Sequence, residues 1–172
     1  MRMKKILLLA VFLVVAGAAM AQKYAYVDME YILNNIPAYA KAQEDLGKIS
    51  EQYKSDLESR RAGIEKMYSA YQSEASRLTA DVKRKREDAI IAAEKEYKDL
   101  QKQHFGPEGT LAQRQEELVK PIQDQILKTI QSMAATGGYA VIFDKASGVS
   151  MIYTNPQFDL SDQVLQKLGY KK

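Results

Sequence analysis

The side chains that could carry catalysis are few and scattered in this sequence. Its one histidine, His104, has no neighbouring nucleophile and no second histidine or cysteine at helical spacing. There is no cysteine, which excludes disulfides and thiolate zinc sites. Serine and aspartate are present, but not in the patterns of a nucleophile elbow, a phosphate loop or a metal-ligand pair. We therefore expect no enzyme activity, no cofactor and no metal ion, and we interpret His104 as a structural residue.

The glycines that follow His104 predict a hinge. Gly106 and Gly109 lie within a helical pattern instead of after a strand, so a phosphate-binding loop is not expected. Proline removes a helix hydrogen bond and glycine loosens the ladder. Gly106, Pro107 and Gly109 are therefore expected to form a kink, at residues 105–109, partway along a helix.

The densest run of charge in the sequence is basic. Its members are Lys83, Arg84, Lys85 and Arg86. This run could contact lipid headgroups, lipopolysaccharide phosphates or acidic polypeptide segments. Alternatively, it is a solvated helix end whose cations pair with Glu87 and Asp88 at helical spacing. Both interpretations stay open from the sequence.

Tyr68 is the aromatic residue best placed for contact with another chain. Tyr53, Tyr71 and Tyr97 fall on apolar seams of the helical pattern and are expected to pack there, whereas Tyr68 lies beside a seam. A tyrosine has a large apolar body and a polar tip, which suits soft and non-specific contacts. Tyr68 is therefore a candidate contact for another polypeptide chain.

The N-terminus has the pattern of a secretory signal peptide. Met1–Lys5 is basic, Ile6–Ala18 is apolar, and the run ends in the small-x-small pattern of a signal peptidase site. About 15 apolar residues are short for a bilayer span, which disfavours the alternative of an uncleaved anchor. We expect residues 1–21 to be removed between Ala21 and Gln22, and the mature protein to be exported.

The expected cleavage makes the protein nearly neutral. The sequence has 25 basic and 22 acidic residues, and the segment removed carries Arg2, Lys4 and Lys5 but no acid. The mature chain would therefore have 22 residues of each sign. Such a balance argues against a strong overall field for nucleic acid or anionic lipid, so any electrostatic role must come from local clusters of charge. We expect no nucleic-acid partner.

A long helical region dominates the mature chain. Pro37 and Pro107 bound 69 residues without proline, flanked by β-like segments at Tyr24–Asp28 and Tyr139–Asp144. Larger apolar residues recur at steps of three, four and seven, which predicts two narrow helical seams. The first seam contains Leu46, Ile49, Tyr53, Leu57, Ile64, Met67, Tyr71 and Leu78. The second contains Ile90, Ala93, Tyr97, Leu100, His104, Leu111, Leu118, Ile122, Ile126, Ile130 and Met133.

The two β-like segments fix where the chain must turn. If they share one sheet, the helical region has to return to its origin, and equal arms place the tip at about residues 76–83. We predict an α+β fold, mostly α, in one domain over residues 22–172. Residues 22–35 and 137–172 would form a β body and residues 36–136 a helical hairpin. A further strand is expected at Val149–Tyr153 and a last helix at Asp162–Leu168.

Several short motifs, in this order, resemble one family over essentially the whole mature chain. They are Val27-Asp-Met29, Glu117–Asp124, Val141–Asp144, Tyr153–Pro156 and Asp159–Asp162. Together with the signal peptide and hairpin, they look like the Skp family, also called OmpH, of periplasmic chaperones. The segment Phe105–Gly109 resembles the variant in Bacteroidetes-type members.

The resemblance implies a homotrimer in the periplasm of a Gram-negative bacterium. Strands of three subunits would form a small β-barrel, and three helical hairpins would surround a cavity that holds unfolded outer-membrane proteins without ATP. Trimer formation would depend on the apolar strand residues Val27, Val141 and Phe143. The family's affinity for lipopolysaccharide and anionic lipid keeps such a contact open, although well-studied members are markedly more basic than this chain.

Two other functions remain compatible with the sequence. A structural coiled-coil adaptor of the envelope would bind one folded partner at fixed stoichiometry, whereas a holdase binds many unfolded chains. A lipopolysaccharide- or lipid-binding protein would lose its function when the charge of Lys83–Arg86 is reversed.

Overall fold

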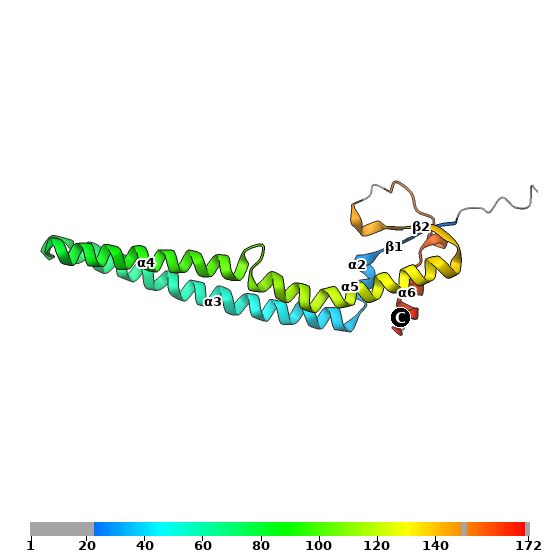
Figure 1. The fold of residues 1–172 in the computed structure, drawn as a ribbon, viewed down its shortest axis with the longest axis horizontal. Coiled ribbons are helices and arrows are strands. Elements are labelled where there is room, and N and C mark those ends of the chain that lie inside the picture. The colour runs from blue at the N-terminus through cyan, green and yellow to red at the C-terminus, as the bar shows by residue number, and fades with distance from the viewer. Residues whose placement is uncertain (1–22, 149–150, 171–172) are drawn as a thin grey trace, which may run out of the picture. The chain divides into compact units, whose positions relative to one another are not determined.

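A computed structural model describes residues 23–148 and 151–170 of the chain. The expected signal peptide and its cleavage point at Ala21 and Gln22 lie outside these residues. Figure 1 shows the helices and strands along the chain. Their bounds are β1 Lys23–Val27, α2 Met29–Asn34, α3 Pro37–Glu74, η1 Ala75–Arg77, α4 Ala80–Phe105, α5 Thr110–Gly137, β2 Tyr139–Asp144, η2 Lys145–Ser147, η3 Pro156–Phe158 and α6 Ser161–Lys167. The expected fold class, mostly helical with a small sheet and a long hairpin, is confirmed.

The chain divides into two compact units. Of the described residues, the body unit contains 23–35 and those from 125 on, and the arm unit contains 36–124. The second division falls inside α5, so the last part of this helix belongs to the body unit. The sequence analysis predicts that boundary at the end of the helix, between residues 136 and 137.

The body unit is built on a pair of parallel strands. β1 pairs with β2 from Lys23 opposite Tyr139 to Val27 opposite Asp144. Parallel strands cannot be joined by a tight turn, and here the whole arm unit is the connection between them. Four side chains are completely or almost completely buried: Ile32 of α2, Ile126 of α5, Leu160 just before α6, and Val164 within α6. These side chains form the apolar interior of the unit.

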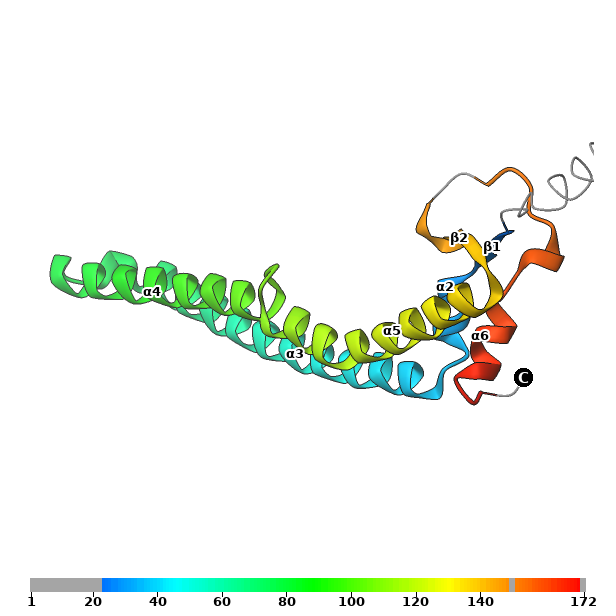
Figure 2. The ribbon, with the colours of Figure 1, turned by 45° about the vertical axis from the view of Figure 1, so that its right-hand side comes forward.

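The arm unit is an antiparallel helical hairpin. Figures 1 and 2 both show α3 beside α4 over most of the length of α4. Leu46 and Leu57 of the first seam and Ile90 of the second are buried. Ala42, Leu46 and Val119 form a buried cluster in which α3 packs on α5, with Tyr39, Leu111 and Leu118 around it. The rest of each helix faces solvent, as narrow seams require.

The chain reverses direction at residues 75–79. α3 ends at Glu74, the single 3₁₀ turn η1 follows, and α4 begins at Ala80. The backbone N–H of Lys83 already donates to the carbonyl of Thr79, at 3.0 Å, within the first turn of α4. The reversal therefore overlaps only the first part of the stretch 76–83, because α4 takes up the rest.

One expected strand is absent from the described residues. Met151–Tyr153 has no strand structure, and residues 149–150 lie outside the description. Ile152 and Tyr153 are almost fully exposed. The β-prone sequence has no neighbouring strand to pair with in this part of the chain, so propensity alone does not make a strand there. The expected last helix is present as α6.

None of the helices in the described residues combines the length and apolar character that a membrane span requires.

Candidate functional site

The basic run Lys83–Arg86 occupies the first two turns of α4. Arg86 forms an ion pair with Glu74 across the tip of the hairpin, at 2.7 Å. Arg84 and Lys85 are exposed and have no ion pair or hydrogen bond among the described residues. In the described residues, none of these four cations forms an ion pair with Glu87 or Asp88. The cations at positions 84 and 85 are therefore open to a partner.

Glu87 contacts a tyrosine of α3 instead of a cation of the basic run. Its carboxylate accepts a hydrogen bond from the Tyr71 hydroxyl of α3. This bond raises the pKa of Tyr71, because it stabilises the protonated hydroxyl beside an anion. Tyr71 and Glu87 thereby fix the level at which α3 and α4 are paired.

The helix dipole bears only weakly on Arg84 and Lys85. The partial positive charge at a helix N-terminus disfavours cations, but this effect falls off within the first turn. Arg84 and Lys85 lie in the second turn of α4 and have no ion pair in the described residues. Neither the dipole nor an ion pair therefore accounts for their placement.

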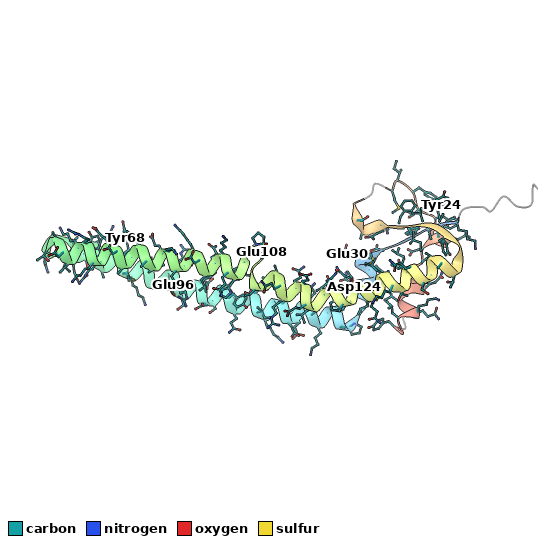
Figure 3. All side chains as sticks on the ribbon, viewed as in Figure 1. Tyr24, Glu30, Tyr68, Glu96, Glu108 and Asp124 are labelled. Atoms are coloured by element: carbon teal, nitrogen blue, oxygen red, sulfur yellow. The ribbon has the colours of Figure 1, made fainter. Side chains whose placement is uncertain are left out.

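Exposed apolar side chains accompany the basic run. Tyr68 of α3 is 52% exposed, as its position beside the seam predicted. Ile91 of α4, which the sequence analysis missed, is 63% exposed. The signal was present in the doublet Ile90-Ile91: a seam takes one of two adjacent residues, so the second must point elsewhere. Figure 3 shows the side chains of the arm, with Tyr68 labelled.

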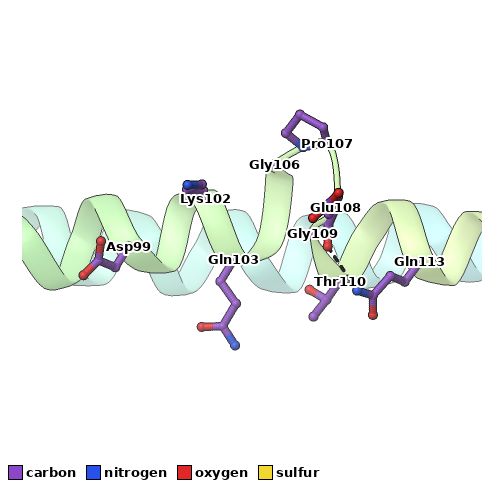
Figure 4. Close-up of a pocket in the computed structure, with 9 residues that line it drawn as sticks. All are labelled: Asp99, Lys102, Gln103, Gly106, Pro107, Glu108, Gly109, Thr110 and Gln113. Carbon is purple, nitrogen blue, oxygen red and sulfur yellow. Dashed lines mark hydrogen bonds between the residues drawn. The ribbon is translucent and has the colours of Figure 1, made fainter.

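The predicted kink at residues 105–109 is a loop between two separate helices. α4 ends at Phe105 and α5 begins at Thr110, and the two helices are joined by a chain that bulges outward (Figure 4). The N–H of Gly109 donates to the carbonyl of Gly106 at 2.8 Å, and Gln113 donates to the carbonyl of Glu108 at 3.0 Å. The expectation of one bent helix was wrong in this respect. Four residues are looped out because Gly-Pro-Glu-Gly cannot keep the helical ladder.

Both glycines of this loop are held by close backbone approach. A Cβ at Gly106 would lie 2.4 Å from the carbonyl oxygen of Lys102. A Cβ at Gly109 would lie 2.8 Å from that of His104. The loop borders an open hollow lined by Asp99, Lys102, Gln103, Gly106, Pro107, Glu108, Gly109, Thr110 and Gln113. Its lining has no group poised for catalysis.

His104 has structural contacts. Its ring stacks on Tyr53 of α3 with centroids 3.8 Å apart and planes 12° apart. Its Nδ1 lies 3.1 Å from the hydroxyl oxygen of Thr110. No group of histidine, cysteine, aspartate or glutamate in the described ranges is arranged to hold a metal ion. His104 thus joins α3 to both ends of the loop.

The comparisons with known proteins agree with this architecture. The sequence model of the family described as outer membrane protein (OmpH-like) matches residues 23–168, which is most of the chain. The chain belongs to the OmpH-like family. An uncharacterized protein of Aquifex aeolicus (strain VF5) is 27% identical over 159 residues, which cover 92% of this chain and 93% of that protein.

A solved structure shares the fold of this OmpH-like chain. It is the crystal structure of a candidate outer membrane chaperone (OmpH-like) from Caulobacter crescentus CB15. The two are 12% identical, with a TM-score of 0.66 over 88% of this chain and 86% of the other. At this identity the match shows the fold alone.

The residues expected to hold an OmpH-like trimer together differ in exposure. Val27 is 2% exposed and belongs to the interior of its own body unit. Val141 and Phe143 of β2 are 41% and 42% exposed. Within the described residues, β2 is paired only with β1. Its second edge and these two side chains are therefore available to another chain.

An apolar hollow of about 700 Å³ lies in the body unit, lined by residues of β1, of β2 and of the segment 151–158. Its aromatic lining includes Tyr24, Tyr26, Phe143, Tyr153 and Phe158. Phe143, Tyr153 and Phe158 are exposed in the single chain. Large exposed apolar patches of this kind are typical of interaction surfaces.

Proposed function

We propose that this OmpH-like chain is an ATP-independent holdase chaperone of the Gram-negative periplasm. It binds unfolded outer-membrane proteins and prevents their aggregation. The observation that carries the proposal is the arm unit, a long helical hairpin with a narrow buried seam and large apolar side chains left exposed beside it. Such a surface offers many weak contacts and no catalytic group, which suits retention of an unfolded chain.

A homotrimer is the assembly that the body unit supports best. Two parallel strands make a marginal sheet on their own. The open edge of β2 and the exposed Val141 and Phe143 invite pairing with further strands. Three copies arranged in a ring would remove the open edges by closing a barrel.

The enclosed cavity would act by separation. Strands of an unfolded β-barrel expose backbone groups and apolar faces that pair readily with other chains. Three arms around one client keep those strands apart. Release needs no ATP, because a client that inserts and folds is more stable elsewhere.

The loop at Gly106, Pro107 and Gly109 is the proposed place at which the arm bends to accommodate larger clients. The break in the helical ladder supports this proposal, while the stacking of His104 on Tyr53 would limit the bend. The same Phe105–Gly109 segment also supports the proposal that the chain is a Bacteroidetes-type member.

A second candidate function is contact with lipopolysaccharide or anionic lipid through the basic run. The exposed Arg84 and Lys85, without ion pairs in the described residues, favour it. Phosphate groups would supply the missing anion. Charge reversal of Lys83, Arg84, Lys85 and Arg86 would abolish binding to anionic vesicles, but would only weaken a holdase.

Dilution of a denatured outer-membrane β-barrel into buffer with the purified protein tests the holdase proposal. Light scattering is followed at increasing ratios of protein to client, without ATP. Scattering should fall to the level of buffer alone as the ratio rises. Unchanged scattering at several-fold excess of trimer would contradict the proposal.

A further inference from the structure

The two sides of the helical hairpin differ in chemistry near its tip. In an antiparallel helix pair, the residues that directly follow the seam on each helix lie on the same side. Those that directly precede the seam lie on the other. Asp56 and Glu96 each precede a seam residue, and Arg60 binds both of them, at 3.3 Å and 2.6 Å. This contact confirms that the preceding residues of α3 and α4 share one side.

We define the Tyr68 side of the hairpin by Tyr68, Arg84 and Ile91. Tyr68 directly follows Met67, which has the spacing of the seam but is itself 38% exposed, and Ile91 directly follows the buried Ile90. Arg84 lies seven residues before Ile91, so it has the same direction two turns earlier, about 10 Å along α4. The opposite side, with Asp56, Val82 and Glu96, is called the Glu96 side.

The residues of the Tyr68 side are close in level along the hairpin. The hydrogen bond between Tyr71 and Glu87 aligns the two helices. Tyr68, three residues before Tyr71, is therefore about level with Ile90. An aromatic ring and an isoleucine, 52% and 63% exposed, thus lie at one level, with an unpaired guanidinium about 10 Å nearer to the start of α4.

We propose that the Tyr68 side is the surface of the arm that contacts the client, and that it selects an unfolded segment bearing apolar side chains and a carboxylate within about three residues of one another. This inference rests on the proposed function and names the contact site for it. An extended chain advances about 3.3 Å per residue, so three residues span the distance from Ile91 to Arg84. The carboxylate would pair with Arg84, which has no ion pair in the described residues.

The size of this surface favours an unfolded segment over a folded partner. Two apolar side chains and one guanidinium bury far less than the roughly 800 Å² per partner of a specific protein interface. A single such contact is weak and easily exchanged. Several contacts in one assembly add up through high local concentration, which is how an unfolded chain is retained without a tight site.

The Glu96 side carries less exposed apolar surface. Its central positions are occupied by the network of Asp56, Arg60 and Glu96. Lys66 and Lys85 directly precede Met67 and Arg86 on this side and have no ion pair in the described residues, so cations open to a partner occur on both sides. The apolar surface differs: Val82 is 39% exposed here, whereas Tyr68 and Ile91 together form the larger patch on the other side. Val82 therefore serves as a control for Ile91.

Two variants of the full chain, exported and processed by the host, test the site. The first is Tyr68→Ser with Ile91→Ser, and the second is Val82→Ser. Both are exposed positions, and unchanged helical circular dichroism and mass in solution establish that each variant folds and assembles. The readout is the ratio of protein to denatured β-barrel that halves light scattering. The first variant should need about three to ten times more protein, as expected for losing two apolar contacts, and the second about the same as the unaltered protein.

The outcomes separate this inference from the function on which it rests. If the unaltered protein suppresses scattering and the two variants behave alike, the Tyr68 side is not the contact surface, while the holdase proposal stands. If the unaltered protein fails as well, both are overturned. A photo-crosslinking amino acid gives an independent result: at position 91 it should capture the client several times more efficiently than at position 82, and equal capture would overturn the inference.

Discussion

The hydroxyl of Ser161 accepts a hydrogen bond from the backbone N–H of Asp28, at 2.9 Å, although 133 residues separate them in the chain. The same hydroxyl donates to the carboxylate of Asp159 at 2.6 Å. Ser161 is the buried polar residue of the described core. Its hydrogen bonds link the end of β1 to the start of α6, and so connect two parts of the body unit that are far apart in the sequence.

Replacing Ser161 by alanine should destabilise the protein. Asp28 would keep a partly buried N–H without its acceptor, which costs roughly 1–3 kcal/mol of the free energy of unfolding. Urea denaturation followed by circular dichroism measures this change. The exposed Ser59 of α3 provides the control, and Ser59→Ala should change the unfolding free energy little. Equal effects of the two substitutions would show that the Ser161 bond contributes nothing.

Glycines in the arm should respond to alanine in opposite directions. Gly109→Ala places a Cβ 2.8 Å from the carbonyl oxygen of His104, and a backbone atom cannot move aside cheaply. We expect it to destabilise the arm and to lower the melting temperature. At Gly63, inside α3, a Cβ would meet nothing within 4 Å. Gly63→Ala should therefore stabilise the helix by about 0.5–1 kcal/mol, and a loss of stability there would contradict the described packing.

The hydrogen bond from Tyr71 to Glu87 should make stability sensitive to alkaline pH. This bond raises the pKa of Tyr71. Its contribution is therefore complete below the ordinary tyrosine pKa of about 10 and is lost as the pH rises through the raised value. Tyr71→Phe should be less stable than the unaltered protein at pH 7, and the difference should shrink towards pH 11. A difference that stays constant over this range would exclude the bond as its cause.

Charge on the exposed face of β2 should prevent assembly. Val141→Glu with Phe143→Glu places two carboxylates where neighbouring strands are proposed to pack. The mass in solution should fall from three chains to one, with helical content retained. Val27→Glu should behave differently, because Val27 is buried within its own body unit and a charge there unfolds that unit. Assembly that survives the double substitution would place the subunit contact elsewhere.

Much of the fold was accessible from local patterns in the sequence. The two seams predicted the antiparallel hairpin, since Leu46, Leu57 and Ile90 follow a helical repeat that only a partner helix can bury. The requirement that β1 and β2 meet placed the reversal near residue 80, although Gly106-Pro107 is the stronger local breaker. The long-range constraint was more informative than local propensity at that point.

Other features depended on contacts that no local pattern contains. The burial of Val27 could not be read from its strand, because it depends on the other elements that pack in the body unit. The ion pair between Arg86 and Glu74 needs the turn that brings α3 and α4 together, whereas local spacing suggested Glu87 and Asp88. The strand expected at Val149–Tyr153 was wrong for the described residues, because β-prone side chains do not form a strand without a neighbour.

The most direct test of the central claim is the mass of the complex formed with a client. An outer-membrane β-barrel denatured in urea is diluted into the purified protein without ATP, and the masses of the complexes are measured by native mass spectrometry. A trimeric holdase should give a species with three copies of this chain and one unfolded client, absent when the same barrel is folded beforehand. A protein that stays free of client, or that binds the folded barrel equally well, would contradict the holdase proposal.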